Sequence, residues 1–368
     1  MKDERAHLQL FDLIAREWTL TSPVTEVVFN AGNTAVAFGC EDGSIHLAST
    51  SDKSSPNQRT RRAVDTGRVT IAPREGHVAP LRMADHTDGR SSAIARHGQT
   101  NFLFAKASGR INTLTPGGLS VHVPQRAAGP VRAVAGLSDG EAIAWSEGAV
   151  VQVGSGTDEA ALPHPGPVYA IAYSPDGGTL AVAHGAGMLL WTLAPTPSAR
   201  DIPLPDIPAA FQWSDNGTHL AVLLETDGFC LTTSDGSEIQ HFGSFPAPVR
   251  SVGFNLVRHT VVASGAYRPA AWSLTGRENL ISGKSGLILI DAIATCPTRN
   301  LVAVGYANGL VSLAEIGRPT EILLRENTGA AIRALAWSGC GNFLAIACAD
   351  GTAALVEFPE AMFKPTGG

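Results

Sequence analysis

The chain of 368 residues is long enough for two or three average domains, or for one closed ring of repeats. Hydrophobic residues make up 44% and charged residues only 16% of it, and its 39 glycines and 23 prolines favour short strands and tight turns over long solvated helices. The net charge of −6, without a block of like charges, argues against a dedicated binder of nucleic acid or anionic membranes.

Residues 1–13 mix acids with bases and are expected to form a terminal tail. They contain no apolar run of signal-peptide length, and no stretch of about 18 apolar residues occurs in the chain. The 5 cysteines are odd in number, widely spread and form no CxxC pair, which argues against a disulfide framework. These features predict a soluble, cytoplasmic protein.

From residue 24 onward the chain repeats one pattern, in which three short apolar runs are separated by turns containing Gly, Asn or Asp. The clearest unit, at 168–193, reads "VYAIAYSPDGGTLAVAHGAGMLLWTL". A fourth strand has room after the third, as in "EIQHF" at 238–242 and "EILLR" at 321–325, and four strands make a propeller blade. The units begin at Val24, Ser91, Val131, Val168, Ala209, Val249, Ile290 and Ile332.

Most units begin about 40 residues apart, which is the spacing expected of four-stranded blades. The first step is longer, and the polar, Arg-rich segment 50–77 accounts for it as an inserted loop between the third and fourth strands of the first unit. The unit from Ser91 has a polar first run, "SSAIARHG". We therefore predict one all-β propeller over residues 14–358, with eight blades and with seven as the alternative.

The two ends of the repeat region predict how the ring closes. After Phe358 the prolines in 359–368 argue against another strand, so the last unit lacks its outer strand and this segment is expected to be a tail. The segment "IAREWTL" at 14–20 precedes the first unit where an outer strand would lie. We expect it to complete the last blade, which would protect a sheet edge and tie the ends of the chain together.

These motifs resemble the WD40-repeat family of β-propellers over residues 14–358, as a bacterial member with degenerate repeats. The shared features are the "SPDG" of 174–177, the "EDG" of 41–43, the "ADG" of 349–351, and Trp191 and Trp272 at the ends of third strands. Neither tryptophan is followed by the family's Asp. The resemblance implies a scaffold that binds proteins or peptides, and it implies no particular partner.

In such a ring the second residue of each first strand is expected near one mouth of the central channel. Arginine and tyrosine are enriched in binding hot spots, so the residues there are a candidate surface for an acidic peptide or loop. The alternative is that Arg250 and Arg333 cap the channel through local ion pairs, including one to Asp291. The eight positions are Thr25, Ser92, Arg132, Tyr169, Ala210, Arg250, Asp291 and Arg333.

Two further groups are weaker candidates. The arginines of the inserted loop, Arg59, Arg61 and Arg62 among them, are expected on the opposite face, where they could hold an acidic partner or simply be solvated. His184 shares one column of the repeat, at the end of the second strand, with Cys40 and Cys348. A metal would need further ligands there, so buried small side chains are the better interpretation of the two thiols.

No catalytic set can be assembled from the sequence. The "GKSG" at 283–286 imitates a phosphate loop, but Glu278 stands where that motif needs glycine and a strand follows instead of a helix. No GxSxG or HExxH motif occurs. We predict a non-catalytic protein-interaction scaffold without a cofactor, with a small-molecule or metal-handling propeller as the alternative and a hydrolase last.

Overall fold

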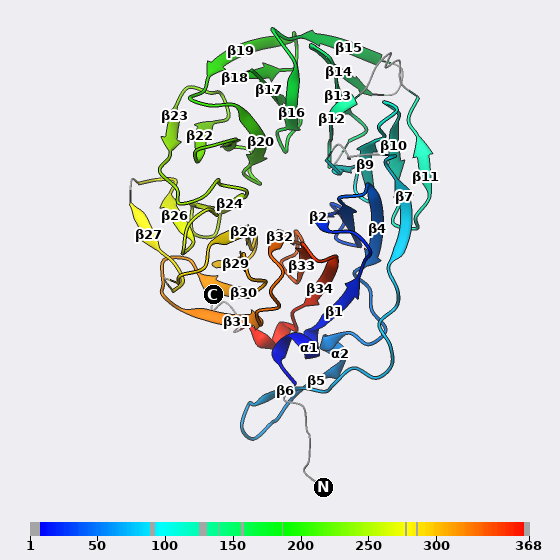
Figure 1. Ribbon diagram of the computed structural model, residues 1–368, viewed down its shortest axis with the longest axis vertical. Coiled ribbons are helices and arrows are strands. Elements are labelled where there is room, and N and C mark those ends of the chain that lie inside the picture. The colour runs from blue at the N-terminus through cyan, green and yellow to red at the C-terminus, as the bar shows by residue number, and fades with distance from the viewer. Residues whose placement is uncertain are drawn as a thin grey trace.

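The structure, a computed structural model, describes residues 8–88, 93–124, 131–138, 140–155, 158–185, 187–276, 278–284 and 286–363. They form eight four-stranded sheets, which follow one another as the blades of a closed ring (Figure 1). The predicted all-β propeller with eight blades is confirmed, and the seven-bladed alternative is wrong because the unit with the polar first run forms a sheet of its own.

The strands of the first four blades follow one another in sheet order from the channel outward. Blade one contains β2 (Val24–Phe29), β3 (Ala35–Cys40), β4 (Ser44–Ser49) and β7 (Arg82–His86). Blade two contains β8 (Ala95–His97), β9 (Asn101–Ala105), β10 (Ile111–Leu114) and β11 (Ser120–His122). Blade three contains β12 (Val131–Gly136), β13 (Ile143–Glu147), β14 (Val150–Ser155) and β15 (Asp158–Pro163), and blade four β16 (Val168–Tyr173), β17 (Thr179–His184), β18 (Gly187–Thr192) and β19 (Ser198–Pro203).

The remaining four blades have the same order of strands. Blade five contains β20 (Pro208–Trp213), β21 (His219–Leu224), β22 (Phe229–Thr233) and β23 (Ile239–Phe242). Blade six contains β24 (Val252–Asn255), β25 (Thr260–Ala263), β26 (Ala270–Ser273) and β27 (Asn279–Ile281). Blade seven contains β28 (Ile290–Thr295), β29 (Leu301–Tyr306), β30 (Val311–Glu315) and β31 (Glu321–Arg325), and blade eight β32 (Ile332–Trp337), β33 (Phe343–Cys348), β34 (Thr352–Glu357) and β1 (Ala15–Thr19).

The apolar runs of the repeat are explained by the burial of the middle strands. Every residue of β3 and of β34 is buried, as is all of β33 except its first residue. Such strands pack on both faces against neighbouring blades, and they therefore read as continuous apolar runs and not as an alternation. The core consists of apolar clusters that join neighbouring sheets, for example the cluster in which residues of β33 and β34 pack on β2 and β3.

The ring closes through the predicted N-terminal strand. β1 pairs antiparallel with β34, from Ala15 opposite Val356 to Thr19 opposite Thr352, which confirms this prediction. The preceding residues form the helix α1 (Leu10–Ile14), whose Phe11 and Ile14 are buried in the core of blades seven and eight. Residues 10–13 are thus a packed helix and not a tail, because these two apolar side chains lie on one face of it.

The C-terminal segment is also more ordered than the sequence suggests. A turn of 3-10 helix, η1 (Glu360–Met362), follows β34, and the ring of Phe363 lies 5.8 Å from that of the buried Phe358. Residues 359–363 therefore pack against blade eight and are not a free tail. The last five residues lie outside the described residues.

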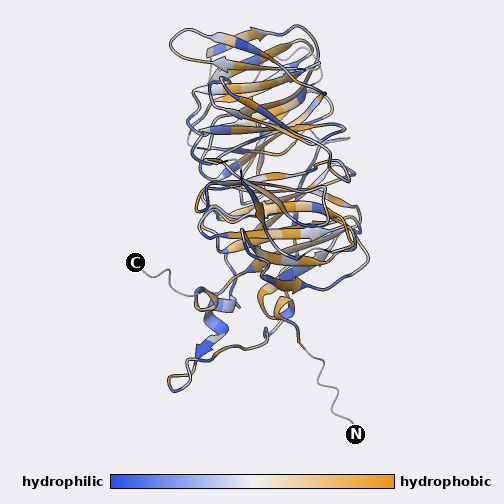
Figure 2. Ribbon diagram, turned by 90° about the vertical axis from the view of Figure 1, so that its left-hand side faces the viewer, coloured by the Kyte–Doolittle hydropathy of each residue, from blue (hydrophilic) through white to orange (hydrophobic). Residues whose placement is uncertain are grey.

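The inserted segment 50–77 joins β4 to β7, the third and fourth strands of blade one. It contains a helix, α2 (Pro56–Arg59), and a hairpin of β5 (Thr60–Arg62) and β6 (Val69–Ile71), so it is a folded insertion and not an irregular loop. It extends beyond the rim of the ring, next to α1 (Figures 1 and 2). Among the described residues, no helix is long and apolar enough to cross a membrane.

The insertion is bonded to blade eight, where the two ends of the chain meet. Glu357 of β34 accepts hydrogen bonds from the hydroxyl of Ser55 and, at 3.1 Å, from the side chain of Asn57. The guanidinium of Arg59 donates to the carbonyl of Leu13 at 2.7 Å, and the indole of Trp18 donates to a carbonyl that follows the insertion. The insertion therefore closes over the outer side of blade eight.

An ion-pair network centred on Asp52 anchors the insertion. Its carboxylate bonds Arg74 and lies 3.7 Å from the guanidinium of Arg16, a buried residue of β1 that also donates to the carbonyl of Ser49 at 2.6 Å. Burial by itself would raise the pKa of Asp52, but the hydrogen bond from Arg74, the N–H of Ser54 and the two positive charges together hold that pKa below its ordinary value.

Candidate functional site

The residues predicted for the channel mouth lie at the beginning of inner strands. Arg132, Tyr169, Asp291 and Arg333 are the second residues of β12, β16, β28 and β32, while Arg250 lies just before β24. All are exposed except Asp291, which is half-buried. We call the side of the ring where the inner strands begin the mouth face.

A common irregularity explains why these side chains are exposed. In six of the blades the pairing of the first two strands shifts register after the first residue, so that the second residue has no partner across the ladder. Such a bulge turns a side chain away from both packed faces. In blade five Pro208 pairs with Leu224, so Ala209 and not Ala210 is the equivalent residue, and Ser92 lies outside the described residues.

The alternative interpretation of the mouth expects Arg250 and Arg333 to cap the channel through local ion pairs, including one with Asp291. Asp291 forms no ion pair with Arg250 or Arg333, all three of which belong to the described part of the chain. The arginines are therefore not neutralised by this acid.

The channel itself contains a cavity of about 510 Å³ lined by inner-strand residues. Arg96 lines it and donates to the carbonyl of Phe29 at 3.0 Å; burial lowers the pKa of this guanidinium, and the charge of Asp215 acts in the opposite direction. Close by, the carboxylate of Glu26 accepts the N–H of Ile94 at 3.0 Å, and burial raises its pKa to about 7. Arg96 and Glu26 thus both bind the protein's own backbone.

The arginines of the insertion differ from one another. Arg59 uses its guanidinium internally, since it bonds the carbonyls of Ser54 and Ala72 as well as that of Leu13. It is therefore a structural residue, and its prediction as part of a free binding surface is wrong. Arg61 and Arg62 lie on β5 and are exposed.

The residues considered for a metal are not brought together. Cys40, His184 and Cys348 end the second strands of blades one, four and eight, and all five cysteines are free. Within the described residues, no group of three or more His, Cys, Asp or Glu side chains could hold a metal ion. The neighbours of His184 are His164, with ring centroids 6.5 Å apart, and Asp201, at 3.6 Å; burial and the charge of His184 lower the pKa of His164 to about 4.

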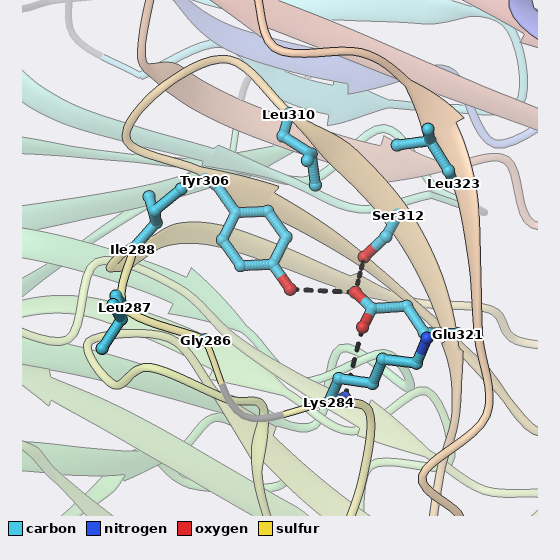
Figure 3. A pocket seen from close by; sticks show the side chains of 9 residues that line it. All are labelled: Lys284, Gly286, Leu287, Ile288, Tyr306, Leu310, Ser312, Glu321 and Leu323. Carbon is cyan, nitrogen blue, oxygen red and sulfur yellow. Dashed lines mark hydrogen bonds between the residues drawn. The ribbon is translucent and has the colours of Figure 1, made fainter.

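The structure adds a pocket that the sequence does not predict. It has a volume of about 290 Å³ and lies between the segment that leads from blade six into blade seven and the outer half of blade seven (Figure 3). Leu287 and Ile288 line it from that segment, Leu310 from the turn after β29, and Leu323 from β31. We call it the side pocket.

A carboxylate lies at the polar end of the side pocket. Glu321 of β31 accepts hydrogen bonds from the hydroxyls of Tyr306, at 2.9 Å, and Ser312, and from the backbone N–H of Lys284 at 3.2 Å (Figure 3). Burial, together with the charge of Glu321, raises the pKa of Tyr306, so the phenol stays a donor at neutral pH. The pocket therefore combines apolar walls with one fixed acceptor.

One signal in the sequence points to this pocket. The fourth strand of blade seven, "EILLR", is apolar where the fourth strand of blade four reads "SARDIP". An outer strand needs no such run for its own burial, and Ile322 and Leu323 are indeed 54% and 50% exposed.

Comparisons with known proteins agree with this architecture. Residues 293–363, which span most of blades seven and eight, match the family model described as the anaphase-promoting complex subunit 4 WD40 domain. Among solved structures, the computationally designed Ika8 protein is similar with a TM-score of 0.65 and 15% identity, over 94% of this chain and 99% of that chain. That likeness shows the fold alone. No curated protein matches the chain.

Proposed function

We propose that the chain, an eight-bladed β-propeller whose residues 293–363 match a WD40 domain model, is a non-catalytic scaffold that binds a partner protein at its mouth face, because propellers of that kind generally serve as protein-interaction scaffolds. The partner presents an acidic peptide or loop. The contact residues are Arg132, Tyr169, Arg250, Asp291 and Arg333. A cytoplasmic location stays a prediction from the sequence.

The observation that carries this proposal is the exposure of Arg132, Tyr169 and Arg333 at the second position of three inner strands, together with that of Arg250 just before a fourth. The guanidinium group presents donors in a fork that matches a carboxylate, and arginine and tyrosine are the residues on which binding energy concentrates. Because the ring brings the beginnings of the inner strands to one end of the channel, a single partner segment could contact several of them.

The exposed hairpin arginines, Arg61 and Arg62, support a secondary surface for the same acidic class of partner. Arg59 does not belong to this surface because it bonds the insertion to α1. Among the described residues, no cluster of ligands favours the metal-handling alternative.

The test is affinity capture from a lysate of the native host, comparing the wild type with the triple variant Arg132→Ala, Arg250→Ala, Arg333→Ala. We expect the specific partner to be lost from the variant. The matched control removes the same charge from exposed arginines away from the channel, through Arg200→Ala, Arg258→Ala and Arg318→Ala. Equal capture by the wild type and both triple variants would contradict the proposal.

A further inference from the structure

We propose that the side pocket holds one arginine side chain of the bound partner, with its guanidinium at Glu321 and its aliphatic stem on Leu287, Ile288 and Leu323. This inference rests on the proposed function, because it gives the partner a second contact outside the mouth. It also gives the partner a charge pattern, with an acidic segment over the mouth and a basic residue in the pocket.

The carboxylate of Glu321 is the first reason for a cationic occupant. It is half-buried and forms no ion pair with any described residue. Its oxygens accept three hydrogen bonds, and a carboxylate has about four acceptor sites, so one site is open to a further donor. A partly desolvated charge gains most from a partner of opposite sign, which favours a guanidinium over a neutral group.

The walls are the second reason, because they are apolar and open. Leu287 is 96% exposed, and Ile288 and Leu323 are exposed as well. An arginine side chain buries its methylene stem on apolar surface and places its charge at the end. The volume of about 290 Å³ is at the lower end of the range of ligand pockets, which suits one long side chain better than a larger molecule.

The position of the pocket connects it with the mouth. The segment that carries Leu287 and Ile288 leads directly into β28, whose second residue is the mouth residue Asp291. Tyr306 ends β29, which runs antiparallel to β28, so it lies on the same mouth face. Tyr306 therefore connects the mouth face with the pocket, whose carboxylate lies on the outer strand β31 opposite Ala314.

Among the described residues, Lys284 is the one cation that lines the pocket, and it favours a rival interpretation. Its backbone N–H bonds Glu321, but its exposed ammonium group forms no ion pair with that carboxylate. If the pocket binds an arginine, this ammonium repels the guanidinium. If instead the pocket binds an anion, Lys284 is the group that attracts it, so the two interpretations predict opposite effects of its removal.

The experiment uses two small probes, N-acetyl-arginine methylamide and its uncharged counterpart N-acetyl-citrulline methylamide. Methyl NMR of the full chain, labelled at Leu and Ile, follows the signals of Leu287, Ile288 and Leu323. We expect the arginine probe to shift these signals saturably and to bind about fivefold or more tightly than the citrulline probe, since a charge-assisted bond replaces a neutral one.

Five variants locate the binding. Glu321→Gln should abolish the preference for arginine over citrulline, whereas Glu326→Gln, an exposed acid beyond the same strand, should keep it. Leu287→Ser should weaken binding of the arginine probe about threefold or more, because the exposed side chain of Leu287 lines the pocket without contributing to the core. Val64→Ser, which replaces an equally exposed side chain on the hairpin, should leave this binding unchanged. Lys284→Met should tighten binding of the arginine probe.

Equal affinity for the two probes, a preference that survives Glu321→Gln, or weaker binding after Lys284→Met would each overturn the proposal. The triple arginine variant of the mouth should bind the arginine probe like the wild type. If the probe experiment fails, only the proposal for the side pocket is contradicted. If partner capture fails while probe binding is intact, only the proposed function is contradicted.

Discussion

The outer strands of blades seven and eight are neighbours in the ring, but one is covered by other segments and the other is an open edge. β1 of blade eight is covered by the insertion, through the buried Arg16 and the Asp52 network, and by the segment that follows it, through Trp18. β31 of blade seven is an open sheet edge that exposes Ile322 and Leu323. An exposed apolar edge is a liability that proteins usually cover or charge. The open edge is therefore available to the proposed partner, whereas the insertion serves the fold.

The largest expected effect is at the covered edge. Asp52→Ala leaves the buried guanidinium of Arg16 without its carboxylate, and breaking a buried pair from one side costs about 3 kcal/mol or more. We expect chemical denaturation to show a lower free energy of unfolding by that amount. Asp201→Ala, which removes an exposed carboxylate, is the control and should cost less than about 0.5 kcal/mol. Similar costs for both would mean that the insertion is not structural.

The same network predicts a dependence on pH. Because the pKa of Asp52 is lower in the folded protein than the ordinary value of about 3.9, its contribution is complete above that value and is lost as the pH falls through the folded-state pKa. The stability difference between the wild type and Asp52→Asn should therefore be constant from pH 7 to about pH 5 and narrow below about pH 4. A difference that does not change down to about pH 2 would contradict the ion-pair interpretation.

At the open edge, adjacent residues of β31 offer a matched pair. Leu323→Ser should change the free energy of unfolding by less than about 1 kcal/mol because the side chain is half exposed, yet it should weaken capture of the partner. Leu324 is the next residue and is only 2% exposed, so Leu324→Ser should lower the free energy of unfolding by about 3 kcal/mol. If both variants destabilise alike, β31 is part of the core and the comparison between the two edges fails.

The smallest effect is expected on the hairpin. The double variant Arg61→Ala, Arg62→Ala should leave the free energy of unfolding within about 0.5 kcal/mol, because both side chains are exposed. Its binding of the partner should fall by about fivefold or less, and only at low salt, since exposed charges are screened. Loss of binding that persists at high salt would make the hairpin the main contact instead of a secondary one.

The fold was largely predictable because its signals are local. Apolar runs, Gly-containing turns and a constant step identify a blade without any long-range information, and the leftover strand at 14–20 could only complete the last blade. The unit boundary in blade five was one residue off because Pro208 reads as a turn residue, whereas it begins β20.

The folded insertion and the side pocket were not predictable, for a different physical reason. Residues 50–77 have no periodicity of their own, and their order depends on distant partners such as Glu357 and Leu13. The side pocket is assembled from three segments, and the exposure of Leu287 follows only from their packing. Apart from the apolar run "EILLR", which marks one wall of the pocket, such tertiary contacts leave no pattern in a single stretch of sequence.

The bulges of the inner strands have a consequence for how such a protein can change. A residue that has no partner across the ladder, and that contacts neither packed face, can be replaced without disturbing the blade that carries it. Arg132, Tyr169, Ala209, Asp291 and Arg333 are then independent positions on a constant frame. A new binding preference could arise one substitution at a time, with every intermediate protein still folded.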